Sequence, residues 1–177
     1  RRRRTDRVPF DFSWGFTPPA LDRFRQRTGH HDPDEYFGTD TRIVRLGPTR
    51  LATDFSAYHG DLPPGTRLDE WGTGHQPTSS DEADHQHLDG FVYPMHGCST
   101  PRDAAAYPLP DLEADYRYEP VAQAIAAIHD RGLAALAAID CTVFEVAWYL
   151  RGMEALLMDM LEAPAFVDDL FDALLAF

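Results

Sequence analysis

The sequence predicts an α/β protein in which helices pack around a parallel sheet. Residues 133–139 form a short apolar run with the length of a buried strand, and the helix before it ends at Gly132. Asp140, Cys141 and Thr142 follow at once, and a long amphipathic helix comes after them. Helix, buried strand, polar tip and helix form the repeating unit of parallel α/β folds, whose functional residues lie at the carboxyl ends of strands.

The first forty residues predict one strand and two helices. Residues 7–12 form the strand. A helix then begins after Thr17, which is followed by two prolines, and it ends at Gly29. A second, shorter helix begins after Asp32 and ends near Gly38.

The stretch from residue 40 to about residue 93 predicts hairpins laid over a larger body. Short strand-like segments alternate there with glycine, proline and polar residues. These segments are residues 41–46, 51–55, 67–71 and 88–93.

The second half predicts mainly helices. Thr100 opens a short helix, a proline-rich linker follows, and residues 119–131 are helical. Thr142 and Glu145 have the spacing of a capping box. Behind them one long helix is predicted, with a 3–4 spacing of apolar residues over five turns. Its predicted buried stripe is Val146, Leu150, Met153, Leu157 and Leu161, and a last helix begins at Pro164.

Length and composition bound the class of protein. With 177 residues, 44% of them hydrophobic, the chain can bury one core and is expected to form one domain. A net charge of −13 argues against nucleic acid as a partner, and two cysteines do not make a disulfide framework. No apolar run reaches the roughly 18 residues that indicate a transmembrane helix. We therefore expect a cytoplasmic protein that does not enter a membrane.

The chain is expected to be the first half of a larger fold. One complete interior strand of a parallel barrel is recognisable, with two further candidates near Phe10 and Ile43. A (β/α)8 barrel takes about 250 residues, and about 200 at least. An open half-barrel is expected to associate, with more chain or with a second copy as in a homodimer. The residues expected at that contact are Phe144, Met153, Leu157, Phe166 and Phe171.

Four segments, in order along the chain, resemble the uroporphyrinogen decarboxylase family, and in particular its branch of bacterial uroporphyrinogen-decarboxylase-like proteins. The most specific is residues 144–159, with the sequence FEVAWYLRGMEALLMD. The others are residues 7–12, the sequence DEWG at residues 69–72 and the sequence AYPLPD at residues 106–111. The resemblance extends over the whole chain but only over the amino-terminal half of the family.

This resemblance implies a (β/α)8 TIM barrel of the superfamily that also contains the cobalamin-independent methionine synthases. Residues 1–118 would be an amino-terminal extension with hairpins and a linker, and residues 119–177 the first helix–strand–helix units of the barrel. The implied activity is decarboxylation of a polycarboxylate tetrapyrrole in porphyrin or heme biosynthesis, without metal or organic cofactor. Alternatives are a corrinoid-linked methyltransferase, which needs zinc and a corrinoid protein, or a non-catalytic fragment.

The resemblance also implies site residues. Asp40 matches the carboxylate that stabilises a protonated pyrrole, and Tyr149 matches a tyrosine of the site. Phe12, Trp14, Asp140 and Phe144 are expected to line a substrate cavity at the carboxyl ends of the strands. The arginine-bearing opening segment, which binds substrate carboxylates in the decarboxylases, has no counterpart in residues 11–18. The substrate is therefore left open.

Each candidate also has a purely structural interpretation. Asp40 can be a turn or strand-edge residue, Asp140 a first-turn acid favoured by the helix dipole, and Tyr149 a packing residue. Cys141 can be a reactive thiol at a helix terminus or a small buried turn residue. Four histidines suggest a zinc or copper site, but solvated loop histidines are the favoured interpretation. They are His75, His85, His87 and His96.

Overall fold

The computed structural model describes residues 8–12, 15–76, 90–138 and 142–176. The chain forms two compact units. The first unit contains Arg1–Gly47 and Asp115–Ile139, and the second contains Pro48–Ala114 and Asp140–Phe177. Each unit is therefore built from two separate stretches of the chain. The sequence predicted one boundary, at residue 118.

Two short helices open the first unit. Helix α1 (Pro18–Thr28) begins after Thr17 and ends at Gly29, as predicted. Helix α2 (Pro33–Phe37) begins after Asp32, whose side chain accepts hydrogen bonds from the amides of the first turn. Both boundaries follow from local chemistry, a proline in the first turn and a glycine in the left-handed region at the end.

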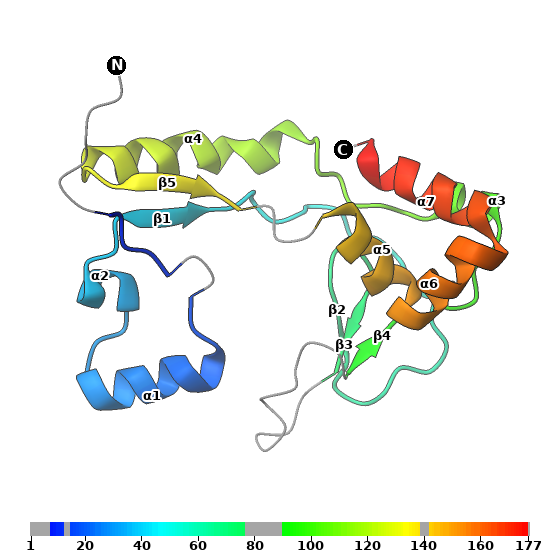
Figure 1. Cartoon of the computed structure of the whole chain (residues 1–177), viewed down its shortest axis with the longest axis horizontal. Coiled ribbons are helices and arrows are strands. Elements are labelled where there is room, and N and C mark those ends of the chain that lie inside the picture. Colours follow the sequence, from blue (N-terminus) through cyan, green and yellow to red (C-terminus); the bar gives the residue numbers. More distant parts are fainter. Residues whose placement is uncertain (1–7, 13–14, 77–89, 139–141, 177) are drawn as a thin grey trace. The chain divides into compact units, whose positions relative to one another are not determined.

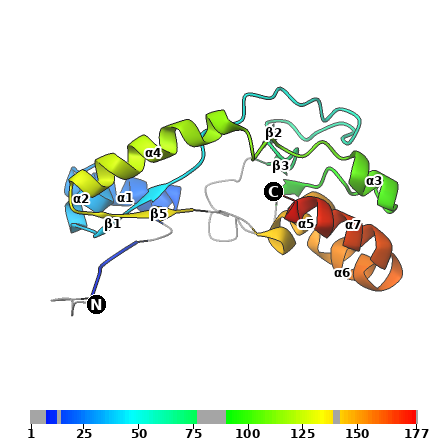
Figure 2. The same cartoon turned by 90° about the horizontal axis from the view of Figure 1, so that it is seen from above.

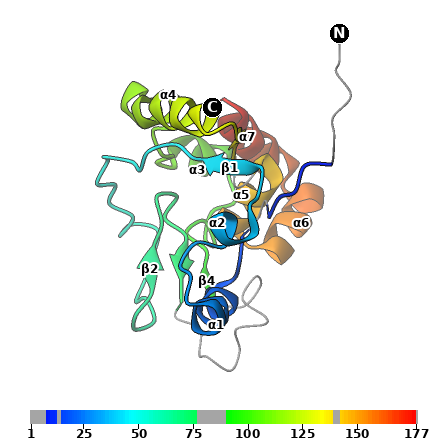
Figure 3. The same cartoon turned by 90° about the vertical axis from the view of Figure 1, so that its left-hand side faces the viewer.

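A two-stranded parallel sheet forms the middle of the first unit. Strand β1 (Thr41–Val44) pairs in parallel with β5 (Ala134–Ala137), so that Thr41 lies opposite Ala134. Helix α4 (Asp115–Asp130) runs along the strand pair (Figures 1 and 2). Figure 3 shows α4 on one side of the pair and α1 and α2 on the other.

The second unit combines a small antiparallel sheet with four helices. Its strands are β2 (Arg67–Leu68), β3 (Gly74–His75) and β4 (Phe91–Val92), in the order β2-β3-β4. Helix α3 (Pro101–Ala106) packs on α7 (Pro164–Leu175). The fully buried side chains at the centre of this core are Met95, Leu150, Leu156, Phe166 and Leu170.

The long helix predicted over residues 143–162 is two helices. Helix α5 (Val143–Arg151) ends at Gly152, whose φ of +92° and ψ of 136° are not helical, and α6 (Met153–Glu162) begins after it. The break rotates the buried face, so that α6 buries Leu156 and leaves Leu157 and Leu161 exposed. The predicted stripe is therefore correct for α5 and wrong for the end of α6.

The strand predictions are partly confirmed. Residues 133–139 contain β5, and residues 67–71 and 88–93 contain β2 and β4. Residues 41–44, predicted both as a hairpin segment and as a candidate parallel strand near Ile43, form a strand of the parallel sheet. Residues 8–12 and 51–55 form no strand.

The described residues contain no closed barrel, and the (β/α)8 fold remains a prediction. Among the residues expected at an association surface, Phe166 is fully buried within the second unit, whereas Phe144 and Leu157 are exposed. Within the described ranges, no helix has the length and apolar character needed to cross a membrane.

Candidate functional site

The six predicted site residues fall into three groups. Asp40 and Phe12 belong to the first unit, and Phe144 and Tyr149 to the second. Trp14 and Asp140 lie outside the described residues, as do Cys141, His85 and His87. The expected convergence of these side chains on one cavity therefore remains a prediction.

Asp40 lies directly before β1, at the amino end of the strand pair. Its backbone N–H donates to Phe10 O, and its Oδ2 accepts from Phe10 N–H, both at 2.8 Å. Its carbonyl accepts from Ala134 N–H, which begins the parallel ladder. The expected place was the carboxyl end of a strand, so the position differs from that implied by the resemblance. The predicted strand-like segment at residues 41–46 already placed Asp40 before a strand, whereas the role at a carboxyl end came from the resemblance.

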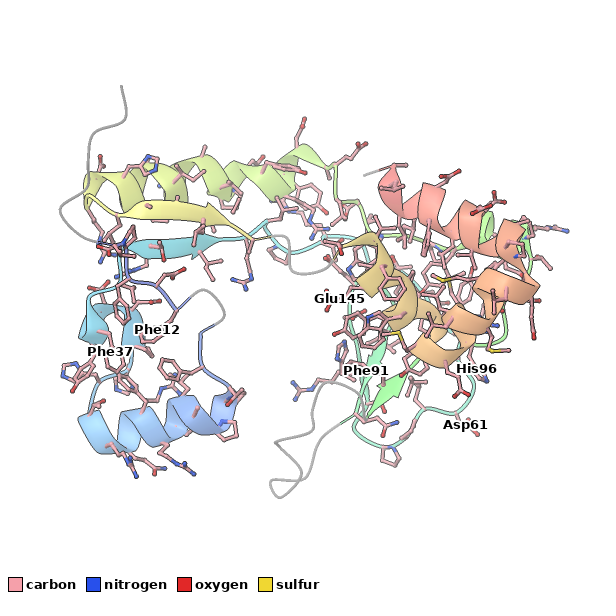
Figure 4. All side chains as sticks on the ribbon, viewed as in Figure 1. Phe12, Phe37, Asp61, Phe91, His96 and Glu145 are labelled. Carbon is pink, nitrogen blue, oxygen red and sulfur yellow. The ribbon has the colours of Figure 1, made fainter. Side chains whose placement is uncertain are left out.

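Phe12 belongs to a small aromatic cluster that holds the first unit together. Its ring lies 5.2 Å from that of Phe37 and 5.4 Å from that of Phe16 (Figure 4). Phe24, which is buried, joins Phe16 to Phe37. This packing accounts for Phe12 without a substrate.

Tyr149 belongs to an aromatic wall in the second unit, which we define as Phe91, Trp148 and Tyr149; Trp148 is buried, and Phe91 and Tyr149 are partly exposed. The rings of Trp148 and Tyr149 stack with centroids 3.9 Å apart, and Phe91 meets Tyr149 edge to face at 5.0 Å. Figure 4 shows Phe91 beside α5, the helix that carries Glu145. Phe144, in the first turn of the same helix, is 42% exposed.

The DEWG segment forms a tight turn organised by the carboxylate of Asp69. Asp69 Oδ1 accepts hydrogen bonds from the N–H groups of Trp71 and Thr73, both at 2.9 Å. Gly72 has a φ of +81°, and a Cβ there would lie 2.6 Å from the ring of Phe55, so that no other residue fits.

Three side chains anchor this turn to the rest of the second unit. The Tyr107 hydroxyl donates to Trp71 O, and His59 Nε2 donates to Gly72 O at 2.7 Å. Burial raises the pKa of Tyr107, so its hydroxyl stays protonated and remains a donor. Thr73 Oγ1 donates to Tyr149 O at 3.2 Å, which connects the turn to the aromatic wall.

His75 joins the turn to the aromatic wall. Its Nε2 donates to Asp69 Oδ2 at 2.8 Å, because an ionised carboxylate can only accept. Its ring meets Phe91 edge to face at 5.3 Å. The sequence interpretation of His75 was a solvated loop histidine or a metal ligand, and the signal it missed is the six-residue spacing from Asp69 across a turn.

A buried ion pair, also missed, fixes the junction of α5 and α6. Arg151 Nε donates to Asp159 Oδ2 at 2.6 Å, and both side chains are about nine-tenths buried. Arg151 Nη1 donates to the carbonyls of Met95 and His96. The eight-residue separation does not indicate an ion pair in a continuous helix, where partners are three or four residues apart.

No group of three histidine, cysteine, aspartate or glutamate side chains in the described part of the chain is arranged to hold a metal ion. Comparisons with known proteins returned nothing: no family model, no curated protein and no solved structure matches the chain. Functional inference therefore rests on the residues and their geometry, together with the resemblance of the sequence segments.

Proposed function

We propose that the protein is a uroporphyrinogen-decarboxylase-like enzyme that works in the cytoplasm and removes carboxylate groups from a polycarboxylate tetrapyrrole. The observation that carries the proposal is the aromatic wall. Two of its three members, Trp148 and Tyr149, come from residues 144–159, the segment with the most specific resemblance to the family. The buried ring of Trp148 supports Tyr149 from behind, and the partly exposed rings of Tyr149 and Phe91 suit a planar pyrrolic ligand, which can lie against aromatic side chains.

For this reaction the protein has to supply a proton and a site that excludes water. Protonation of a pyrrole carbon makes the ring an electron sink, the carbon–carbon bond to the carboxylate then breaks, and CO2 leaves. The exocyclic carbon then takes up a proton in place of the lost carboxylate, and the proton added to the ring leaves, which restores the pyrrole. Neighbouring polar groups that are held in place contribute most, because they need no reorganisation during the reaction. The hydroxyl of Tyr149 is the group of the wall that the resemblance places at the reacting ring.

The test is direct. The protein, produced from its full gene, is incubated without oxygen with uroporphyrinogen, and the products are oxidised and separated by their number of carboxylates. We expect tetrapyrroles with fewer carboxylates and release of CO2. Tyr149→Phe is expected to lower turnover by about tenfold or more, since it removes a positioned hydroxyl.

Tyr118→Phe is the matched control, because Tyr118 is 48% exposed on α4 in the other unit. It is expected to keep wild-type turnover. The absence of any product with fewer carboxylates, under conditions where the protein is folded, would refute the proposal.

A further inference from the structure

Three residues of the antiparallel sheet lie in one row across its strands. In the observed register Arg67 lies opposite His75, and His75 lies opposite Phe91. Residues directly opposite each other in antiparallel strands project on the same face, with Cβ atoms about 5 Å apart. The ring contact between His75 and Phe91 agrees with this register. A guanidinium, an imidazole and a phenyl ring therefore follow one another along one face of the sheet.

This row is on the exposed face of the sheet. Arg67 and His75 are exposed, whereas Gly74, on the opposite face, is buried. A Cβ at Gly74 would lie 2.9 Å from side-chain atoms of Thr66 and Val92, which shows how closely the covered face is packed. The two basic side chains are thus exposed to a ligand, whereas Gly74 on the opposite face is packed against Thr66 and Val92.

The side chains of Arg67 and His75 contribute little to the stability of the fold. Within the described residues, the guanidinium of Arg67 forms no hydrogen bond or ion pair. His75 is held at Nε2 by Asp69, and the carboxylate of Asp69 is itself fixed by two backbone amides. Exposed ion pairs of this kind add little stability. The arrangement fixes the direction of the imidazole and leaves Nδ1 as the nitrogen not engaged by Asp69.

The guanidinium of Arg67 carries a charge opposite to the net charge of the protein. The chain has 29 acidic and 16 basic residues, a net charge of −13. Arg67 and His75, beside the aromatic wall, form a local site for an anion, and the nearby carboxylate of Asp69 is already hydrogen-bonded to His75 and to two backbone amides. A guanidinium pairs with a carboxylate through two parallel hydrogen bonds, and the imidazole adds a third donor at Nδ1 when both of its nitrogens carry a proton.

We infer that Arg67 and His75 bind a carboxylate of a ligand whose aromatic or pyrrolic ring lies against Phe91 and Tyr149. This inference deepens the proposed function, on which the choice of a tetrapyrrole as ligand rests. It supplies what the sequence lacks, since residues 11–18 contain no arginine to bind substrate carboxylates. The acidic side chain would approach from the β2 edge, and the ring would extend toward α5.

Uroporphyrin, the oxidised octacarboxylate, is a suitable probe because its binding can be followed by absorbance and fluorescence without turnover. Arg67→Gln and His75→Gln are each expected to weaken its binding about tenfold, the loss expected when a charge-assisted hydrogen bond is removed. Arg67→Lys, which keeps the charge without the planar fork, is expected to fall between Arg67→Gln and the wild type.

Arg102→Gln is the matched control, since Arg102 is an exposed arginine on α3 in the same unit. It is expected to bind uroporphyrin as the wild type does. Circular dichroism and the thermal midpoint establish that each variant is folded. The octamethyl ester of uroporphyrin, which has the same ring without charges, is expected to bind at least tenfold more weakly than the acid.

Equal binding of the ester and the acid, or unchanged binding in both glutamine variants, would overturn the inference. Competition by millimolar inorganic phosphate in preference to benzoate would assign the pair to a phosphate instead, and would overturn it as well. Binding that depends on Arg67 and His75, in a protein that never releases CO2, would refute the proposed reaction and leave the inference standing. The two proposals therefore fail on different measurements.

Discussion

The carboxylate of Asp40 can stabilise a charged substrate, or it can accept the hydrogen bond from Phe10 N–H. Loss of its charge would affect turnover in the first case and would change little in the second. Asparagine keeps an oxygen that can accept the hydrogen bond from Phe10 N–H. We expect Asp40→Asn to change the free energy of unfolding by less than about 1 kcal/mol. Because Asp40 lies at the amino end of β1, we also expect turnover to stay within about threefold of the wild type.

Urea unfolding and the decarboxylation assay measure the two effects of Asp40→Asn. A fall in turnover of about 10²-fold with unchanged substrate binding would restore Asp40 to the catalytic role that the resemblance implies. Asp40→Ala, which also removes the acceptor for Phe10 N–H, shows in the same unfolding assay what the hydrogen bond itself contributes.

Loss of the buried ion pair between Arg151 and Asp159 is expected to lower the stability of the second unit strongly. Asp159→Asn leaves the buried guanidinium without a countercharge, and breaking a buried pair in this way typically costs about 3–5 kcal/mol. We expect a loss of that size in urea unfolding. Asp22→Asn is the control, because Asp22 pairs with Arg25 at the surface at 3.3 Å. Its cost is expected to stay below about 1 kcal/mol. Similar losses in both variants would contradict the assignment.

Three residues of the candidate site show which of its features could be predicted from the sequence. Tyr149 was predicted because its segment resembles a known family, and the structure places it in an aromatic wall. The Asp69–His75 hydrogen bond was not predicted, since it depends on a turn whose shape is set by contacts with Phe55 and Tyr107. The cross-strand position of Arg67 follows from the register of a two-residue ladder, which no local pattern fixes.

At the scale of elements, Gly152 decides where α5 ends. Its φ of +92° is rarely open to residues with a side chain, and a Cβ there would lie 3.2 Å from the ring of Tyr93. Gly152→Ala is expected to destabilise the protein by about 1–3 kcal/mol, the usual cost of forcing such a conformation. Gly97→Ala is the control, because a Cβ at Gly97 meets nothing within 4 Å. Equal urea midpoints for the two variants would show that the break is not imposed by this residue.

Helix boundaries were predictable where the signal is local. Asp32 caps α2 with its side chain, as its type and the following proline indicate. Thr142 begins α5 as predicted, but its side chain makes no capping hydrogen bond, so the predicted capping box is wrong. The break at Gly152 was missed because the 3–4 spacing of apolar residues continues past it, and only tertiary contacts show that the second half of the stripe is exposed. Strands of two residues carry too little pattern to be located reliably.

At the scale of the whole molecule, the two units differ in how much they bury. The thirteen residues of the main hydrophobic core all lie in the second unit, between Phe55 and Leu174. In the first unit the buried apolar side chains among the described residues are Phe24 and Val44, and β5 is largely exposed. Since burial of apolar surface is the main source of stability, the second unit is expected to be the more stable of the two.

Amide hydrogen exchange measures this difference directly. Amides in regions with few buried contacts exchange through local opening, whereas amides in a well-packed core exchange only when the core unfolds. We expect the ladder amides of Ala134 and Ala138 to exchange about 10²-fold faster than amides in the middle of α7. Leu170→Ala, at a fully buried position of α7, is expected to remove about 2–5 kcal/mol of stability and to speed exchange in α5 and α7. If Ala134 and Ala138 exchange as slowly as α7 in the wild type, the first unit has a source of stability beyond its own aromatic cluster and strand pair.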